Sequence, residues 1–158
     1  MKPSVQSGNN EVTLSWDQIH RDSIILSNKI KESGIEFDGI VAITKGGLFP
    51  SAIISRELNI NYIDTFCINS YKNKTHNNPN IFKLCNNDEN ERLLFIDDLT
   101  DTGITISLIK RTFSFNKDNK FSVLYTKPSG HDEADFYVSK FKQNTWIVFP
   151  WEIKWSEC

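Results

Sequence analysis

The feature that most constrains the fold is the stretch at residues 93–105, which reads LLFIDDLTDTGIT. Four apolar residues run into two carboxylates, and a segment of small hydroxyl and glycine residues follows before a helical pattern. This order is typical of a buried parallel strand, a polar loop at its carboxyl end and a helix that begins on the loop. Such loops bind phosphate through backbone N–H groups, and ligands bind at that edge of open α/β sheets. Because two adjacent carboxylates suit a sugar diol and hydrated Mg2+, the stretch predicts a phosphorylated sugar with a metal.

The composition is that of one soluble domain, because 158 residues with 39% hydrophobic content can build a single core. A net charge of -2 argues against a general nucleic-acid-binding surface. The chain has no membrane-length apolar run and no signal-peptide pattern in its polar first ten residues. Cys67, Cys85 and Cys158 lack metal-ligand spacing, so we expect reduced thiols in a cytoplasmic protein.

Strand and helix patterns alternate along the first half of the chain. Apolar spacing predicts a helix over residues 16–32, capped by Ser15, ended near Gly34 and with Trp16 in the core. A short apolar run at 38–43 predicts a strand, and a helix is expected over 50–58. The loop between them holds one lysine and two glycines, so it is a second candidate anion-binding loop.

The second half continues the alternation around one long polar segment. We expect strands over 61–68, 120–126 and 135–138, a helix over 104–113, and a C-terminal aromatic-rich tail at 144–152. Residues 69–92 lose periodicity, apart from a possible strand at 81–84, which is typical of a lid or a disordered loop. The pattern predicts a mainly parallel α/β sheet, in which right-handed crossovers place both anion-binding loops at one edge.

The stretch at 93–105 resembles the signature of type I phosphoribosyltransferases that binds 5-phosphoribosyl 1-diphosphate (PRPP). More narrowly, the chain is similar to the bacterial xanthine-guanine branch of that family, over about residues 11–152. The other similar stretches, in the family's order, are residues 46–50, 55–58, 64–71, 127–130, 144–147 and 150–152. The resemblance implies a single domain over 1–158 with the type I phosphoribosyltransferase fold, in which helices flank the sheet. It also implies a flexible lid loop at about 69–92 and a small base-binding hood at about 128–158.

The resemblance implies transfer of the phosphoribosyl group from PRPP to a 6-oxopurine in purine salvage, with Mg2+ as cofactor. The residues implied to bind PRPP are Lys45, Gly46, Gly47, Asp97, Asp98, Asp101, Thr102, Gly103, Ile104 and Thr105. Asp97 and Asp98 are implied to face the ribose hydroxyls, with Asp98 closer to the metal. Asp101 is the candidate general base for the purine ring proton; alternatively it only orders the phosphate loop.

The residues implied to contact the purine follow the later strands. Lys127 is expected to donate to the 6-oxo group, Trp146 to stack on the base, and Ile147 and Glu152 to lie at its edge. Ser70 and Tyr71 fit the start of the lid. The chain departs from the family at Thr100, where an aliphatic residue is usual, and at Lys45, where Arg is more common. An ungapped count also places Asn77 at the position of the family's lid Arg.

These departures leave two other interpretations open. One is a PRPP-dependent transferase with a different acceptor, and the other is a nucleotide-sensing regulator on the same fold. The expected partners are small-molecule substrates, PRPP and a purine base, without nucleic acid or a membrane span. The resemblance also implies a homo-oligomer, either a dimer or a tetramer.

Overall fold

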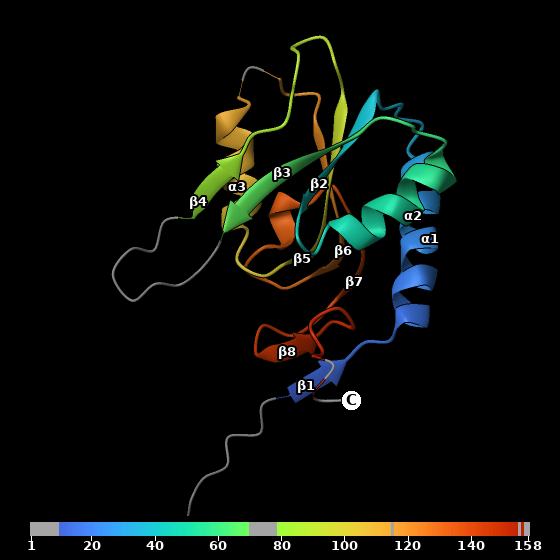
Figure 1. The fold of residues 1–158 in the computed structure, drawn as a ribbon, viewed down its shortest axis with the longest axis vertical. Helices are drawn as coiled ribbons and strands as arrows, with labels where there is room; N and C mark the ends of the chain where they lie inside the picture. The colour runs from blue at the N-terminus through green and yellow to red at the C-terminus, as the bar shows by residue number, and fades with distance from the viewer. Residues whose placement is uncertain (1–9, 70–78, 115, 155, 157–158) are drawn as a thin grey trace, which may run out of the picture.

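A computed structural model describes residues 10–69, 79–114, 116–154 and 156, and its centre is a six-stranded sheet (Figure 1). In spatial order its strands are β4 (Asn80–Lys83), β3 (Ile63–Asn69), β2 (Gly39–Thr44), β5 (Leu93–Thr100), β6 (Lys120–Thr126) and β7 (Phe136–Lys140). All neighbours are parallel except β3 and β4, which pair antiparallel. The predicted mainly parallel sheet is therefore confirmed.

Helices cover both faces of this sheet (Figure 1). The helices α1 (Trp16–Glu32) and α2 (Leu48–Leu58) pack on one face, over a core that contains Ile40, Leu94 and Ile96. The helix α3 (Ile104–Thr112) lies on the other face, over a core with Val41 and Phe95. Neighbouring residues of β2 and β5 thus point into opposite cores, which explains why both strands read as unbroken apolar runs.

A second, two-stranded sheet joins the two ends of the chain below the central sheet (Figure 1). β1 (Asn10–Thr13) pairs parallel with β8 (Thr145–Val148), and the Leu14 N–H donates to the Val148 carbonyl at 2.9 Å. β7 and the short 3-10 helix η1 (His131–Glu133) fall inside the range 128–158 expected for the hood, but β7 belongs to the central sheet.

Local sequence signals explain several element boundaries. The Ser15 hydroxyl accepts the Gln18 N–H at 3.2 Å and caps α1, while Gly34 adopts a φ of 70° just beyond its end. The prediction that Trp16 is a core residue is wrong. Its side chain is 52% exposed and contacts the rings of Phe49 and Trp151 at the edge of the molecule.

The strand β5 is longer than the sequence predicts. The predicted strand is the apolar run before Asp97 and Asp98, but β5 continues through them to Thr100, where its register with β6 is Thr100↔Thr126. The prediction relied on the apolar run, whereas pairing with β6 extends the strand into polar sequence. Within the described residues, no helix has both the length and the apolar character needed to cross a membrane.

Candidate active site

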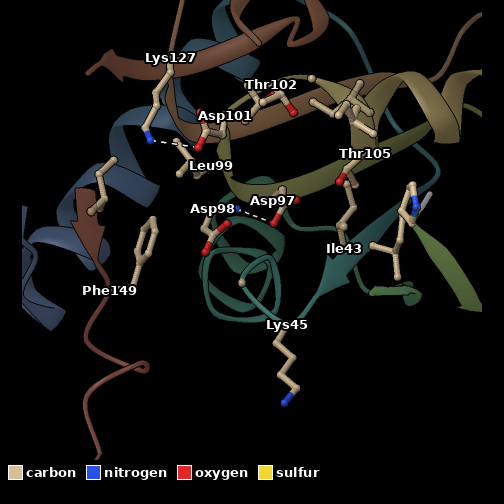
Figure 2. A pocket seen from close by; sticks show the side chains of 18 of the residues that line it. Ile43, Lys45, Asp97, Asp98, Leu99, Asp101, Thr102, Thr105, Lys127 and Phe149 are labelled. Atoms are coloured by element: carbon tan, nitrogen blue, oxygen red, sulfur yellow. Dashed lines mark hydrogen bonds and ion pairs between the residues drawn. The ribbon is translucent and has the colours of Figure 1, made fainter. Parts of the chain in front are cut away.

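A cavity of about 880 Å³ opens at the carboxyl ends of the parallel strands (Figure 2). Its wall is built by the segments that follow β2, β5 and β6, together with β8 and the tail after it. It contains most of the predicted site residues: Lys45, Gly46, Asp97, Asp98, Asp101, Thr102, Gly103, Ile104, Thr105, Lys127, Trp146, Ile147 and Glu152. Gly47 is not in this wall, and Ser70, Tyr71 and Asn77 lie outside the described residues.

Asp97 and Asp98 form a carboxylate pair at the end of β5 (Figure 2). The Asp98 N–H donates to Asp97 Oδ1 at 2.9 Å. Burial, and then the charge of Asp98, raise the pKa of Asp97 well above its usual range. Burial also raises the pKa of Asp98 from 3.8 to about 6, with a smaller contribution from the charge of Glu152. In the described part of the chain, neither carboxylate forms an ion pair with a Lys or Arg, so the pair favours an approaching cation.

The loop after β2 approaches this pair through Gly46. A Cβ at that position would collide with the Asp98 carboxylate, so only glycine lets the backbone come this close. The peptide bond between Thr44 and Lys45 is cis, and the exposed Lys45 side chain points away from the two aspartates (Figure 2). Gly47 lies behind the cavity wall, where a Cβ would meet the Ile43 carbonyl at 2.6 Å.

Residues 101–105 form a turn that leads into the first turn of α3. Gly103 precedes this helix with a φ of 79°, a conformation that residues with a Cβ rarely adopt. The first N–H groups of a helix have no acceptor within it, so those at the start of α3 are available to an anion. Thr102 and Thr105 add hydroxyl groups on the same side (Figure 2).

Thr100, which departs from the family pattern, has a local explanation. It is 4% exposed, and its hydroxyl donates to the Gly130 carbonyl at 3.4 Å. A Cβ on Gly130 would lie 2.6 Å from this hydroxyl and 2.9 Å from the Gly103 nitrogen. Thr100 therefore joins the turn before α3 to the loop after β6, and the threonine is compatible with the backbone of the turn at residues 101–105.

Lys127 and Asp101 form an ion pair inside the cavity (Figure 2). Lys127 Nζ lies 3.1 Å from Asp101 Oδ2, and the Lys127 side chain is 6% exposed while that of Asp101 is 48% exposed. The Lys127 N–H also donates to the Thr100 carbonyl at 3.0 Å, which fixes the backbone at the end of β6. A buried ammonium beside a half-exposed carboxylate presents both a hydrogen-bond donor and a proton acceptor to a bound molecule.

Aromatic side chains from β8 and the tail after it also line the cavity. Trp146 is 63% exposed, whereas Ile147 is buried between β8 and the core. Phe149 also lines the cavity, and Glu152 Oε2 accepts the Phe149 N–H at 3.0 Å (Figure 2). An exposed indole ring above a packed apolar layer is a surface on which a flat heterocycle can stack.

Phe149 and Gln143 are among the residues at the site that were not predicted from the sequence. Phe149 had no assigned role, although it belongs to the aromatic tail, which was a usable signal. Gln143 contacts Asp101, donating from Nε2 to Oδ1 at 2.6 Å. A single glutamine in a loop carries no pattern in the sequence, so only the tertiary structure identifies it.

The sequence matches one family model and is similar to several known proteins. A family model described as "Phosphoribosyl transferase domain" matches residues 15–157. The chain is 44% identical over 140 residues to a xanthine-guanine phosphoribosyltransferase of Desulfotalea psychrophila, covering 88% of this chain and 84% of the relative. It is 39% identical over 150 residues to the protein of that name from Chromohalobacter salexigens, covering 95% and 89%.

Solved structures with the same fold include enzymes that act on purines. A purine phosphoribosyltransferase from Pyrococcus horikoshii has a TM-score of 0.78 and 30% identity, covering 92% of this chain and 96% of that one. A xanthine-guanine-hypoxanthine phosphoribosyltransferase from Helicobacter pylori has a TM-score of 0.77 at 19% identity, covering 90% and 94%. The second likeness concerns the fold alone.

Proposed function

This chain belongs to the phosphoribosyltransferase family, and on that basis we propose that it transfers the 5-phosphoribosyl group from PRPP to a 6-oxopurine. The products are the nucleoside monophosphate and diphosphate, and guanine, xanthine and hypoxanthine are the candidate acceptors. The observation that carries the proposal is the Lys127–Asp101 pair, 3.1 Å apart, in the same cavity as the anion-binding turn and the exposed Trp146 ring. The identities of 44% and 39% to xanthine-guanine enzymes support it.

Each part of the cavity matches one part of PRPP. The N–H groups and hydroxyls at residues 101–105 suit the 5′-phosphate, and the carboxylates of Asp97 and Asp98 suit the ribose hydroxyls. The loop at Lys45 and Gly46, which lines the same cavity, suits the diphosphate, which leaves with the electron pair of the bond from C1′ to oxygen. Developing positive charge at C1′ is compatible with the two nearby carboxylates.

The acceptor half of the reaction uses the Lys127–Asp101 pair. The Lys127 ammonium donates to the 6-oxo group, which selects against adenine because an amino group at that position is itself a donor. A ring nitrogen of the purine forms the new bond to C1′, and Asp101 takes the proton that the imidazole ring loses. Trp146 stacks on the purine, and Ile147 and Glu152 lie toward its edge.

The carboxylate pair also fits Mg2+. Its ligands are hard oxygens, and burial, which raises the pKa of both Asp97 and Asp98, disfavours their ionised forms, a cost that a bound cation would offset. Among the described residues, no group of three or more His, Cys, Asp or Glu side chains is placed to hold a metal. Asp98 would therefore hold the ion together with substrate and water oxygens. When bound, Mg2+ neutralises charge on the diphosphate. A cytoplasmic location and a homo-oligomeric state stay predictions.

The test is a turnover assay with purified protein, Mg2+, PRPP and each of guanine, xanthine, hypoxanthine and adenine. We expect the monophosphate from at least one 6-oxopurine and none from adenine. Asp101→Asn is expected to lower kcat by at least about 100-fold while PRPP still binds, because it removes the proton acceptor and leaves the phosphate turn intact.

The exposed Asp118→Asn is the matched control, since Asp118 lies away from the cavity and the substitution is the same. Absence of product with all three 6-oxopurines would refute the proposal. PRPP binding by calorimetry without turnover would indicate a regulator, and product only with another acceptor would indicate a different transferase.

A further inference from the structure

The Asp101 carboxylate is held at both oxygens by side chains from two different loops. Lys127 Nζ lies 3.1 Å from Oδ2, and Gln143 Nε2 donates to Oδ1 at 2.6 Å. The Gln143 amide nitrogen also lies 3.4 Å from the Asp101 carbonyl oxygen. Asp101 itself is exposed at the cavity rim, so without these two contacts its side chain would have several open rotamers.

The orientation of the Gln143 amide is determined by a third contact. Its Oε1 accepts the Ser129 N–H at 2.9 Å, so its NH2 group must face Asp101. Ser129 follows Lys127 in the loop after β6, and Gln143 lies just before β8 with its Trp146. One amide therefore connects the proton acceptor to the two segments that carry the proposed purine contacts.

We infer that Gln143 is a positioning residue that keeps the Asp101 carboxylate directed at the purine while Lys127 donates to the base. This inference rests on the proposed function. In the structure, the Lys127 ammonium is paired with Asp101 Oδ2, and Gln143 is bound to the other oxygen, Oδ1. Once a 6-oxo group takes a Lys127 N–H, Oδ2 accepts the ring proton and Gln143 remains bound to Oδ1. The contact to Gln143 thus preserves the orientation of Asp101 when its ion pair weakens.

The competing explanation is that Gln143 only fastens the loop at Ser129. Gln143→Glu separates the two roles, because it keeps an oxygen for the Ser129 N–H and replaces the donor to Asp101 by a second carboxylate. Gln143→Met removes both contacts at nearly constant side-chain length. A role limited to the loop predicts that Gln143→Met, which loses the Ser129 contact, is the more impaired variant, whereas a positioning role predicts that Gln143→Glu is the more impaired.

We expect Gln143→Glu to lower kcat by about 10-fold, with KM for PRPP within about twofold of wild type. A 10-fold loss is about the smallest effect expected for a hydrogen bond to a charged group, because Gln143 is exposed and water competes for the contact. Gln18→Glu on α1 makes the same charge change away from the cavity and is expected to leave both constants unchanged.

The second measurement is the thermal unfolding midpoint, Tm, of Gln143→Glu in the Asp101 and Asp101→Asn backgrounds. In Asp101→Asn, the Lys127 ammonium can only donate a hydrogen bond, so the oxygen of the Asn side chain at position 101 faces Lys127. The NH2 group of that side chain then faces residue 143. Gln143→Glu should therefore lower Tm when residue 101 is Asp and raise it when residue 101 is Asn. A loop-fastening role would give the same change in both backgrounds.

Unchanged kcat in Gln143→Glu, or a Tm change independent of residue 101, would overturn the positioning role while wild-type turnover still supported the proposed function. If the wild-type protein makes no monophosphate from any 6-oxopurine, the proposed function fails and the inference fails with it. The two failures are thus distinguished by the wild-type assay.

Discussion

Asp98→Asn is expected to make the protein more stable above pH 6 and to abolish its activity. Burial raises the pKa of Asp98 from 3.8 to about 6, so the folded state binds this proton more tightly than the unfolded state does. Wild-type protein consequently loses stability as the pH rises from about 4 to about 6, relative to a variant with a neutral side chain. Below pH 4 the carboxyl is protonated in both states and the difference disappears.

The size of the effect follows from the pKa. A rise from 3.8 to about 6 corresponds to at most about 3 kcal/mol of lost stability when Asp98 is fully ionised. Because Asp98 lines an open cavity, water screens part of this charge, and about 1–3 kcal/mol is the realistic range. For a chain of this length, that range corresponds to a Tm increase of about 3–10 °C.

The assay is differential scanning calorimetry at pH 8 and pH 4, with and without PRPP and Mg2+. Without ligand, Asp98→Asn should have the higher Tm at pH 8 and a similar Tm at pH 4. With ligand at pH 8, only the wild-type Tm should rise substantially, because the variant has lost the proposed contact to the metal and the ribose.

Asp64→Asn is the control with the opposite sign. Burial would raise the pKa of Asp64, but hydrogen bonds from Lys83 Nζ and from the N–H groups of Asn86 and Thr65 outweigh it and lower that pKa. Asp64 therefore stabilises the fold above pH 4, and this contribution is lost as the pH falls through its lowered pKa. We expect Asp64→Asn to lower Tm at pH 8. If Asp98→Asn also lowers Tm at pH 8, the buried negative charge of Asp98 does not destabilise the fold and the reasoning from its raised pKa is refuted.

Two further substitutions test the two halves of the cavity. Lys127→Met is expected to lower kcat/KM for the 6-oxopurine by about 10- to 100-fold while KM for PRPP stays within about twofold of wild type. Steady-state kinetics measures both constants. Equal losses for the two substrates would contradict the proposed contact of Lys127 with the purine. Gly46→Ala introduces a Cβ about 2.6 Å from Asp98 Oδ1, so we expect KM for PRPP to rise by at least about 10-fold. Unchanged PRPP binding by calorimetry would show that the close approach of the Gly46 backbone to Asp98 is dispensable.

The elements with strong local signals could be predicted from the sequence. α1 has regular apolar spacing, a serine cap and a glycine after its end, and its bounds are those predicted. β6 likewise coincides with the apolar run at 120–126. The extension of β5 through Asp97 and Asp98 has no such signal, because it depends on pairing with β6. The apolar spacing identified the buried face of α1, but it did not show that Trp16, at the start of the helix, lies beyond the core.

The candidate site divides in the same way. The carboxylates, the threonines and the one glycine in the stretch at 93–105 were predictable because phosphate and sugar binding require those residue types in that order. The cavity indeed collects them at one edge of the sheet. The contact of Gln143 depends on where the loop after β7 returns to Asp101, and nothing local to that loop specifies it. That Gly47 lies outside the cavity wall also needs the structure, since its backbone packs against that of Ile43.

The small sheet of β1 and β8 has a consequence for how acceptor preference varies. In the described residues β8 pairs only with β1, and two-stranded sheets are marginal in water unless a hydrophobic face is packed. Ile147 and Leu14 provide that packing, while Trp146 remains exposed at the cavity. A one-residue slip of β8 would exchange the faces of Trp146 and Ile147 and remove the stacking surface. The residues proposed to face PRPP instead come from β2, β5 and their loops, so we expect substitutions in β1 and β8 to change the acceptor while PRPP binding is retained.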